Sequence, residues 1–168
     1  MPTTKTLILN NLEISQKIDR ISFQILEDNH LEEEIIIVGI SNNGYLFADK
    51  LAKKLKKISD VKITLVKLTL NKENPLSQDI VIDKPTNILS NQVIILVDDV
   101  LNSGRALIYG VKYLLDYPIK RMSTAVLVDR NNKRYPIGTH YTGLALSTTL
   151  KNNISVEFTK GEMSAYLS

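Results

Sequence analysis

Two adjacent acids, Asp98 and Asp99, follow the apolar run of residues 93–97 and precede a turn of small residues. A pair of carboxylates accepts hydrogen bonds from neighbouring hydroxyl groups, and it holds a hard cation directly or through water. The turn at residues 102–106 leads into a helical pattern, and the backbone amides of such a turn form a concavity that suits a phosphate. Together these features predict a ligand with a diol at one end and a phosphate at the other, which is the layout of ribose 5-phosphate.

A simpler interpretation assigns the same residues to the start of a helix. Asp98 and Asp99 would then be charges near the helix N-terminus, and Ser103 would cap the helix. An isolated pair of acids would favour this interpretation. The complete string of strand, acids, small-residue turn and helix favours the ligand site.

Apolar residues recur with two different periods along the chain, one typical of helices and one typical of strands. These periods predict helices over residues 10–29, 44–57 and 105–115, and strands over residues 34–40, 61–68, 93–97 and 123–128. Strands that alternate with helices form βαβ units with right-handed crossovers. The expected fold is therefore α/β, a mostly parallel twisted sheet flanked by helices.

Ligands bind to such sheets beyond the carboxyl ends of the strands. Three segments follow predicted strand ends, namely residues 41–44, 98–105 and 129–134. A fourth segment, residues 68–92, is polar and carries two prolines. A stretch of that length without a strong element usually forms a lid or is disordered.

The composition is that of an ordinary globular protein, with 43% hydrophobic and 23% charged residues in a chain of 168. We expect a single domain over residues 1–168, since the length suits one core and no linker or repeat is visible. The absence of cysteine excludes disulfides and thiolate metal sites. No apolar run approaches the roughly 18 residues of a membrane span and no leader is evident, so we expect no membrane contact and a cytoplasmic location. The net charge of +3 permits a polyanionic ligand without requiring one.

The stretch IILVDDVLNSGRAL, residues 94–107, resembles the motif with which type I phosphoribosyltransferases bind phosphoribosyl pyrophosphate (PRPP). More narrowly, the chain resembles the PyrR family, pyrimidine-operon attenuators that also have uracil phosphoribosyltransferase activity. VDDVLNSGR is close to that family's VDDVL-x-T-G-R, and AVLVDRNNKRYPI, residues 125–137, is close to its strand, DR and LPI segment. The likeness runs nearly from end to end of the chain.

The resemblance implies a role for each group of residues. Asp98 and Asp99 would bind the ribose 2- and 3-hydroxyls and a water-linked Mg2+. The 5-phosphate would lie on the amides of Asn102, Ser103, Gly104, Arg105 and Ala106, with the Ser103 hydroxyl, and the pyrophosphate loop would comprise Ser41, Asn42, Asn43 and Gly44. The base pocket would comprise Asp129, Tyr141, Thr142 and Leu144, and a small mobile hood would comprise about residues 68–92 with Lys67 and Lys72 nearby.

The reaction implied by the resemblance transfers the 5-phosphoribosyl group of PRPP to a nucleobase, with uracil favoured, and releases pyrophosphate. Its oxocarbenium-like transition state would be stabilised mainly by electrostatics, with Mg2+ sharing that work. The family also implies a homo-oligomer.

Several residues depart from the family pattern and keep a second hypothesis open. Asn43 stands where the family commonly has Arg, Ala106 replaces a second hydroxyl of the phosphate loop, and Leu68 and Thr69 replace two acids. The alternative is a catalytically weak regulator that binds PRPP or a nucleotide and acts on RNA or a protein partner. A third hypothesis is a structural paralogue that binds neither ligand.

The remaining charged and histidine residues are less informative. The lysines of DKLAKKLKK, residues 49–57, favour a solvated helix face over an RNA contact, because no aromatic residues interleave with them. NNKR, residues 131–134, is more typical of an exposed turn than of a binding loop. His140 precedes the predicted base-pocket residues, which leaves both a ligand contact and a structural role open.

Overall fold

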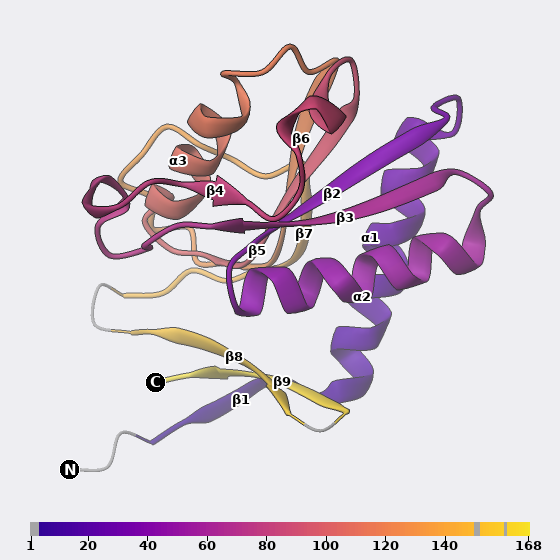
Figure 1. Ribbon diagram of the computed structural model, residues 1–168. Helices are drawn as coiled ribbons and strands as arrows, with labels where there is room; N and C mark the ends of the chain where they lie inside the picture. The colour runs from indigo at the N-terminus through magenta and orange to yellow at the C-terminus, as the bar shows by residue number, and fades with distance from the viewer. Residues whose placement is uncertain (1–3, 150–151, 160) are drawn as a thin grey trace.

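A computed structural model of the chain describes residues 4–149, 152–159 and 161–168, in which two β-sheets and three α-helices form (Figure 1). The larger sheet contains β2 (Glu34–Ile40), β3 (Lys62–Thr69), β4 (Val81–Ile82), β5 (Val93–Leu101), β6 (Arg121–Asp129) and β7 (Tyr141–Ala145). The helices are α1 (Asn11–Asn29), α2 (Asn43–Ile58) and α3 (Arg105–Leu114). A smaller sheet, called the terminal sheet below, contains β1 (Thr6–Leu9), β8 (Ile154–Thr159) and β9 (Glu162–Leu167).

The larger sheet is mostly parallel, as the sequence predicts. Its strand order is β4-β3-β2-β5-β6-β7, and only β4 runs antiparallel to its neighbour. The chain moves from β2 outward to β3 on one side, and from β5 outward to β6 on the other. The order therefore reverses between β2 and β5, and the loops that follow these two strands diverge there, which is where open α/β sheets bind ligands.

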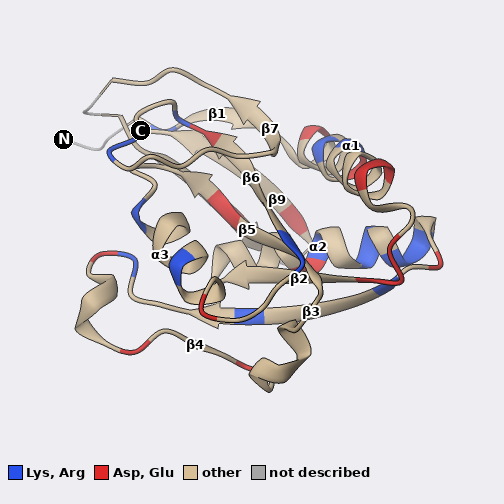
Figure 2. Ribbon diagram, turned by 90° about the horizontal axis from the view of Figure 1, so that it is seen from above, with Lys and Arg blue, Asp and Glu red and all other residues tan. Residues whose placement is uncertain are grey.

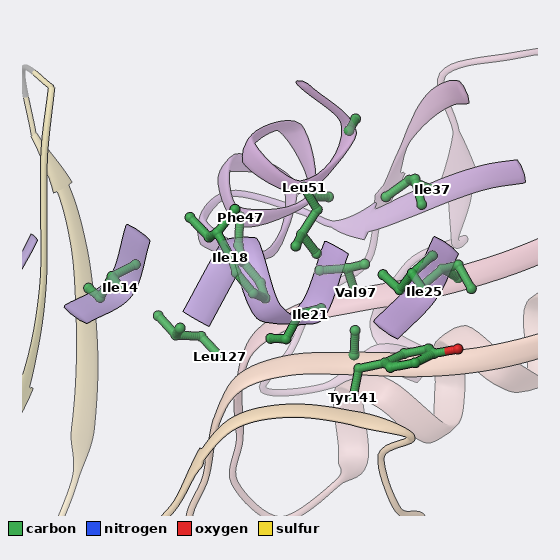
Figure 3. Close-up of a cluster of buried hydrophobic side chains, with 14 of the residues drawn as sticks. Ile14, Ile18, Ile21, Ile25, Ile37, Phe47, Leu51, Val97, Leu127 and Tyr141 are labelled. Atoms are coloured by element: carbon green, nitrogen blue, oxygen red, sulfur yellow. The ribbon is translucent and has the colours of Figure 1, made fainter. Parts of the chain in front are cut away.

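Helices cover both faces of this sheet because the central strands are apolar on both sides. Ile35 and Ile37 of β2 pack with α1 and α2, whereas the alternate residues Ile36 and Val38 pack on the α3 side. Figure 3 shows the first of these cores, in which isoleucines of α1 meet Phe47 and Leu51 of α2.

The terminal sheet was not predicted from the sequence. It joins the two ends of the chain, since β9 pairs with β1 on one side and with β8 on the other, and both pairings are antiparallel. Its strands are short and have one polar face, so their pattern alone is weak, and only packing completes them. Val156 and Ala165 are buried in the core beneath α1 and α2.

Strand β5 is longer than expected. The prediction ended it at residue 97, before the acids, but its ladder with β6 continues through the pairs Asp98 with Val126 and Leu101 with Asp129. The pairing with β2 ends at Val97, so hydrogen bonding to β6 alone carries β5 past the charged residues. Strand β7 was also missed, and β6 begins two residues earlier than predicted, at Arg121.

Residues 68–92 contain more structure than a loop. They include the end of β3, two 3-10 turns (η1, Pro75–Ser77, and η2, Thr86–Leu89) and β4, which pairs with β3 at the sheet edge. Leu70 and Leu89 are buried. Only the first part of this segment approaches the carboxyl end of β5, since Lys72 and Glu73 line the cavity there. Strand β4 lies at the edge of the sheet, and Leu89 packs into the core on the α3 side.

Among the residues described, none of the helices is both long enough and apolar enough to cross a membrane. The expected single domain, residues 1–168, includes residues 1–3, 150–151 and 160, which lie outside the described residues, and it stays a prediction.

Candidate active site

A cavity of about 290 Å3 lies at the carboxyl end of β5. It is lined by Lys72 and Glu73, by every residue from Asp98 to Leu107, and by Val126, Arg134 and Ile154. The predicted ribose residues, the predicted phosphate loop and Lys72 therefore share one cavity. Ile154 belongs to β8, so the terminal sheet supplies part of the wall.

The two acids are almost fully buried and are paired with one lysine. Lys72 Nζ lies 2.7 Å from Asp98 Oδ1 and 3.4 Å from Asp99 Oδ1. Asp98 and Asp99 are 3% and 9% exposed, a burial that acids tolerate only with such a partner. Figure 2 shows this acidic segment on β5, in the middle of the larger sheet.

The electrostatics of this group favour proton exchange near neutral pH. Burial and the neighbouring Asp99 raise the pKa of Asp98 to about 8, although the Lys72 ammonium works in the opposite direction. Burial alone would lower the pKa of Lys72, but the carboxylates of Asp98 and Asp99 outweigh it and raise that pKa above its ordinary value. Perturbed ionisable groups in a cavity are a common mark of a functional site.

The turn after β5 has the geometry of an anion site. Gly104 has a φ of 88°, in the left-handed region that favours glycine, and the backbone then enters α3 at Arg105. The Arg105 N–H donates to the Ser103 hydroxyl oxygen at 3.2 Å. The other amides of the first turn of a helix have no partner within the helix, and they are therefore free to bind a phosphate.

The predicted pyrophosphate loop lies beside the acids. It connects β2 to α2, and the Ser41 N–H donates to the Leu68 carbonyl at 2.8 Å. Gly44 touches the acids most closely: a Cβ added there would lie 2.7 Å from Asp98 Oδ1. Asn42 has a positive φ of 67°. These four residues do not line the cavity itself.

Asn43 is occupied by a structural contact. Its side-chain amide donates to the carbonyl of Val156 on β8 at 2.8 Å, which ties the first residue of α2 to the terminal sheet. The sequence comparison suggested that Asn43 replaces a charged contact to pyrophosphate with a neutral one. In this structure its amide is instead directed at the backbone of β8.

The residues predicted for the base pocket are dispersed. Asp129 lies at the end of β6, where its carboxylate accepts the Asn131 N–H at 2.8 Å. Tyr141 is buried at the start of β7, inside the core shown in Figure 3, and its hydroxyl donates to Asp28 at the end of α1. The Thr142 hydroxyl bonds to that of Thr139, and Leu144 packs against the α1 and α2 core.

Tyr141, Thr142 and Leu144 thus do not reach the cavity, because β7 runs parallel to β6 and its carboxyl end is Ala145. Residues after Ala145 lie closer to the phosphate loop, through Arg130. The guanidinium of Arg130 donates to the Thr148 hydroxyl at 3.0 Å and to Asn102 Oδ1 at 3.2 Å, so this arginine joins the phosphate loop to the segment after β7.

Other predicted and unpredicted residues complete the description. Lys67 does not line the cavity; its Nζ lies 5.5 Å from the centre of the Tyr45 ring. Glu73, Arg134 and Ile154 line the cavity and were not predicted. The side chain of Arg105 reaches the carbonyl of Glu73 at 2.7 Å.

His140 accepts the Thr124 N–H at 3.2 Å, which gives it a structural role at the start of β7.

The donor set suits a magnesium ion that is shared with a ligand. No group of three or more acidic, His or Cys side chains gathers anywhere in the described ranges. Mg2+ is commonly held by one or two carboxylates, with waters and substrate phosphates completing its coordination. Asp98 and Asp99 fit that arrangement, and they do not fit a cage made by the protein alone.

The family model for the phosphoribosyl transferase domain matches residues 5–159 of the chain. The chain belongs to the phosphoribosyltransferase family. The expectation from the motif at residues 94–107 is confirmed, and so is the expected enzyme class, a pentosyltransferase, at the level of the family.

Curated relatives confirm the narrower resemblance. The "Bifunctional protein PyrR" of Macrococcus caseolyticus is 30% identical over 158 residues, which cover 90% of this chain and 91% of that protein. The protein of the same name from Streptococcus pneumoniae is also 30% identical, and the match covers 91% of this chain and 90% of the relative.

Solved structures agree on the fold. A hypoxanthine-guanine phosphoribosyltransferase from Bacillus anthracis has a TM-score of 0.75 at 15% identity, covering 97% of this chain and 99% of that one. A hypoxanthine phosphoribosyltransferase from Staphylococcus aureus also has a TM-score of 0.75 at 15% identity, covering 95% and 90%. At such identities the likeness shows the fold and does not show the base.

Proposed function

We propose that the protein transfers the 5-phosphoribosyl group of PRPP to a ring nitrogen of a nucleobase and releases pyrophosphate. The observation that carries the proposal is that Asp98, Asp99 and the turn at residues 102–106 line one cavity. In the reaction the bond from the ribose anomeric carbon to the pyrophosphate oxygen breaks, and pyrophosphate leaves with the electron pair. The base nitrogen forms the new bond to that carbon and loses its proton to solvent.

The residues of the cavity account for donor binding. The ribose 2- and 3-hydroxyls donate to the carboxylates of Asp98 and Asp99, and the 5-phosphate lies on the amides of the turn. Lys72 occupies the same carboxylates at 2.7 and 3.4 Å, so it must give way to the ribose diol. Bound Mg2+ would supply charge neutralisation for the leaving pyrophosphate.

Buried carboxylates also suit the transition state. Positive charge develops on the ribose ring as the leaving group departs, and charges fixed in a cavity act more strongly than charges in water. Asp98 is paired with Val126 in the ladder of β5 with β6, and Asp99 lies between two paired residues, so both acids need little reorganisation.

Uracil is the acceptor that we favour, because the relatives named PyrR match over nine-tenths of the chain. The solved structures of hypoxanthine phosphoribosyltransferases make a purine the second choice. A screen with PRPP and Mg2+ against uracil, hypoxanthine and guanine, with pyrophosphate release as the readout, tests both. We expect turnover with uracil, and we expect Asp99→Asn to lower the rate of pyrophosphate release at least about 100-fold. Wild-type protein that releases no pyrophosphate with any base would reject the transferase.

A regulator without turnover is the second candidate. The contact of Asn43 with Val156 favours it, since the proposed pyrophosphate loop has no charged side chain and its Asn43 amide is already engaged. Such a protein would bind Mg2+ and PRPP without releasing pyrophosphate. An RNA target would reveal itself by an affinity that falls steeply with salt. The lysines of α2 give an RNA target little support, because Lys53 and Lys54 are paired with Asp49 and Asp19.

A homo-oligomer and a cytoplasmic location belong to the same proposal. Sedimentation of the purified protein tests the first, and a fluorescent fusion tests the second.

A further inference from the structure

Arg134 lines the cavity although its sequence context predicts an exposed turn. It is the last residue of NNKR and lies beyond the end of β6, opposite the phosphate loop after β5. The side chain is exposed, as it must be to meet a ligand that enters from solvent. Its position at the rim of the cavity makes it a candidate ligand-binding residue.

The backbone around Arg134 is held against the phosphate loop. The N–H groups of Arg134 and Tyr135 both donate to the Ser103 carbonyl, at 2.7 and 3.2 Å. The packing nearby is just as tight: a Cβ added at Gly104 would lie 2.5 Å from Ile137. Arg134 is therefore attached to the turn that would carry the 5-phosphate, so its guanidinium stays near that turn.

The other cations of the cavity are already engaged. Lys72 pairs with Asp98 and Asp99, and Arg105 donates to the Glu73 carbonyl at 2.7 Å. For Arg134, no side-chain ion pair or hydrogen bond is found within residues 4–149, 152–159 and 161–168. Its positive charge is thus available to an anion.

We propose that Arg134 binds the 5-phosphate of the donor and replaces the hydroxyl that is missing at Ala106. This inference rests on the proposed function and assigns a further binding residue to that site. An alanine at position 106 removes one donor from the phosphate, while the amides of the turn remain. A guanidinium offers two parallel donors and a full charge, which is stronger than the single neutral donor of a hydroxyl.

The proposal predicts which part of the donor depends on Arg134. The 5-phosphate is shared by PRPP and ribose 5-phosphate, whereas pyrophosphate lacks it. Titration calorimetry with Mg2+ and each of these three ligands separates the contributions. We expect Arg134→Gln to weaken the binding of PRPP and of ribose 5-phosphate by the same factor, roughly 10- to 100-fold, and to leave the affinity for pyrophosphate unchanged.

Lys133→Gln is the matched control. Lys133 is the neighbouring exposed cation, it is absent from the cavity wall, and its removal changes the net charge equally. Its substitution should leave all three affinities within about twofold of wild type. Arg134→Lys, which keeps the charge but loses the paired donors, should fall between wild type and Arg134→Gln.

A double variant tests the replacement of the hydroxyl directly. Ala106→Ser restores a hydroxyl at the start of α3, so it should recover much of the affinity lost in Arg134→Gln and add little in wild type. Thermal unfolding of each variant checks that it is folded.

Three results would overturn the inference while leaving the proposed function intact. The first is equal affinity of Arg134→Gln and wild type for ribose 5-phosphate. The second is a loss of pyrophosphate affinity in Arg134→Gln as large as its loss of PRPP affinity. The third is a loss of PRPP affinity in Lys133→Gln as large as that in Arg134→Gln. Wild-type protein that binds neither PRPP nor ribose 5-phosphate would overturn the inference and the proposed function together.

Discussion

At the scale of single residues, the site depends on two buried carboxylates that the fold can keep only with help. Asp98 and Asp99 lie in the part of β5 that continues past its pairing with β2, and they are almost fully buried there, so an uncompensated charge would be costly. Lys72 supplies the compensation from a segment that lies far from them in the sequence. The same pairing leaves the acids ready to exchange one partner, an ammonium, for another.

Lys72→Gln should raise the pKa of Asp98 above its value of about 8, because the ammonium is the main influence that holds that pKa down. A 13C titration of the aspartate carboxyl groups measures the change. Lys67→Gln is the matched control, since Lys67 lies over the Tyr45 ring. An unchanged titration in Lys72→Gln would show that the ion pair does not form in solution.

Gly44→Ala should damage both stability and donor binding. The new Cβ would lie 2.7 Å from Asp98 Oδ1 and 3.1 Å from Asp98 Cα, so the acid or the helix must shift. We expect a loss of about 1–3 kcal/mol in the free energy of unfolding, measured with urea, and at least tenfold weaker PRPP binding. Gly138→Ala is the control, because a Cβ there meets no atom within 4 Å. Equal behaviour of the two variants would contradict the close approach.

At the scale of elements, the strands that carry the acids could be predicted and those that complete the cavity could not. The run at residues 34–40 gives β2 with its exact bounds, because six consecutive apolar or small residues after Glu34 suit a strand buried on both faces. Strands β8 and β9 carry no comparable signal, since their pairing joins residues from both ends of the chain. The position of Ile154 in the cavity wall could therefore not be predicted from the sequence.

The predicted sites divide in the same way. Asp98, Asp99 and the phosphate loop follow from a local motif, whose spacing is visible in the sequence. Lys72 is expected near the site through the family resemblance alone. Its ion pairs with Asp98 and Asp99, like the position of Arg134, depend on how separate loops meet, which no local pattern in a single sequence encodes. The base-pocket prediction placed Tyr141 by resemblance alone, and the register of β7 with β6 turns its side chain into the core instead.

Asn43→Ala should loosen the terminal sheet from α2. The substitution removes the hydrogen bond to the Val156 carbonyl, a loss of about 0.5–1.5 kcal/mol in the free energy of unfolding. Amide hydrogen exchange should rise in β8 and not in β6. Asn87→Ala, at an exposed position in η2, provides the comparison. Unaltered exchange in β8 would mean that the hydrogen bond from Asn43 to Val156 does not stabilise this strand.

Tyr141 links α1 to β7 and should make stability depend on alkaline pH. Burial and the hydrogen bond to Asp28 raise the pKa of Tyr141 above its ordinary value, so the folded protein keeps a proton that the unfolded chain releases near pH 10. The free energy of unfolding should therefore fall as the pH rises above about 10.

Tyr141→Phe should cost about 1 kcal/mol at pH 7.5, through the lost hydrogen bond, and should flatten that alkaline decline. Urea unfolding at pH 7.5 and 10.5 gives both values. Tyr109→Phe, on α3 beside Lys112, is the control. A decline as steep in Tyr141→Phe as in wild type would assign the alkaline effect to other residues.

At the scale of the whole molecule, the fold brings four separate segments to one place. The strand order reverses between β2 and β5, so the loop of residues 41–44 and the phosphate loop diverge around the acids. The terminal sheet closes one side through β8, and the start of the 68–92 segment reaches over the acids with Lys72. This arrangement supports the proposed donor site, and the screen of bases tests the acceptor.

The most direct test is titration calorimetry of PRPP with Mg2+ on wild-type protein and on the double variant Asp98→Asn, Asp99→Asn. The double substitution keeps the shape of both side chains and removes the charges that would meet the ribose hydroxyls and the metal. We expect saturable binding in wild type and a loss of at least about 100-fold in the variant. Absence of heat in wild type, or equal binding in the two proteins, would contradict the assignment of this cavity to PRPP.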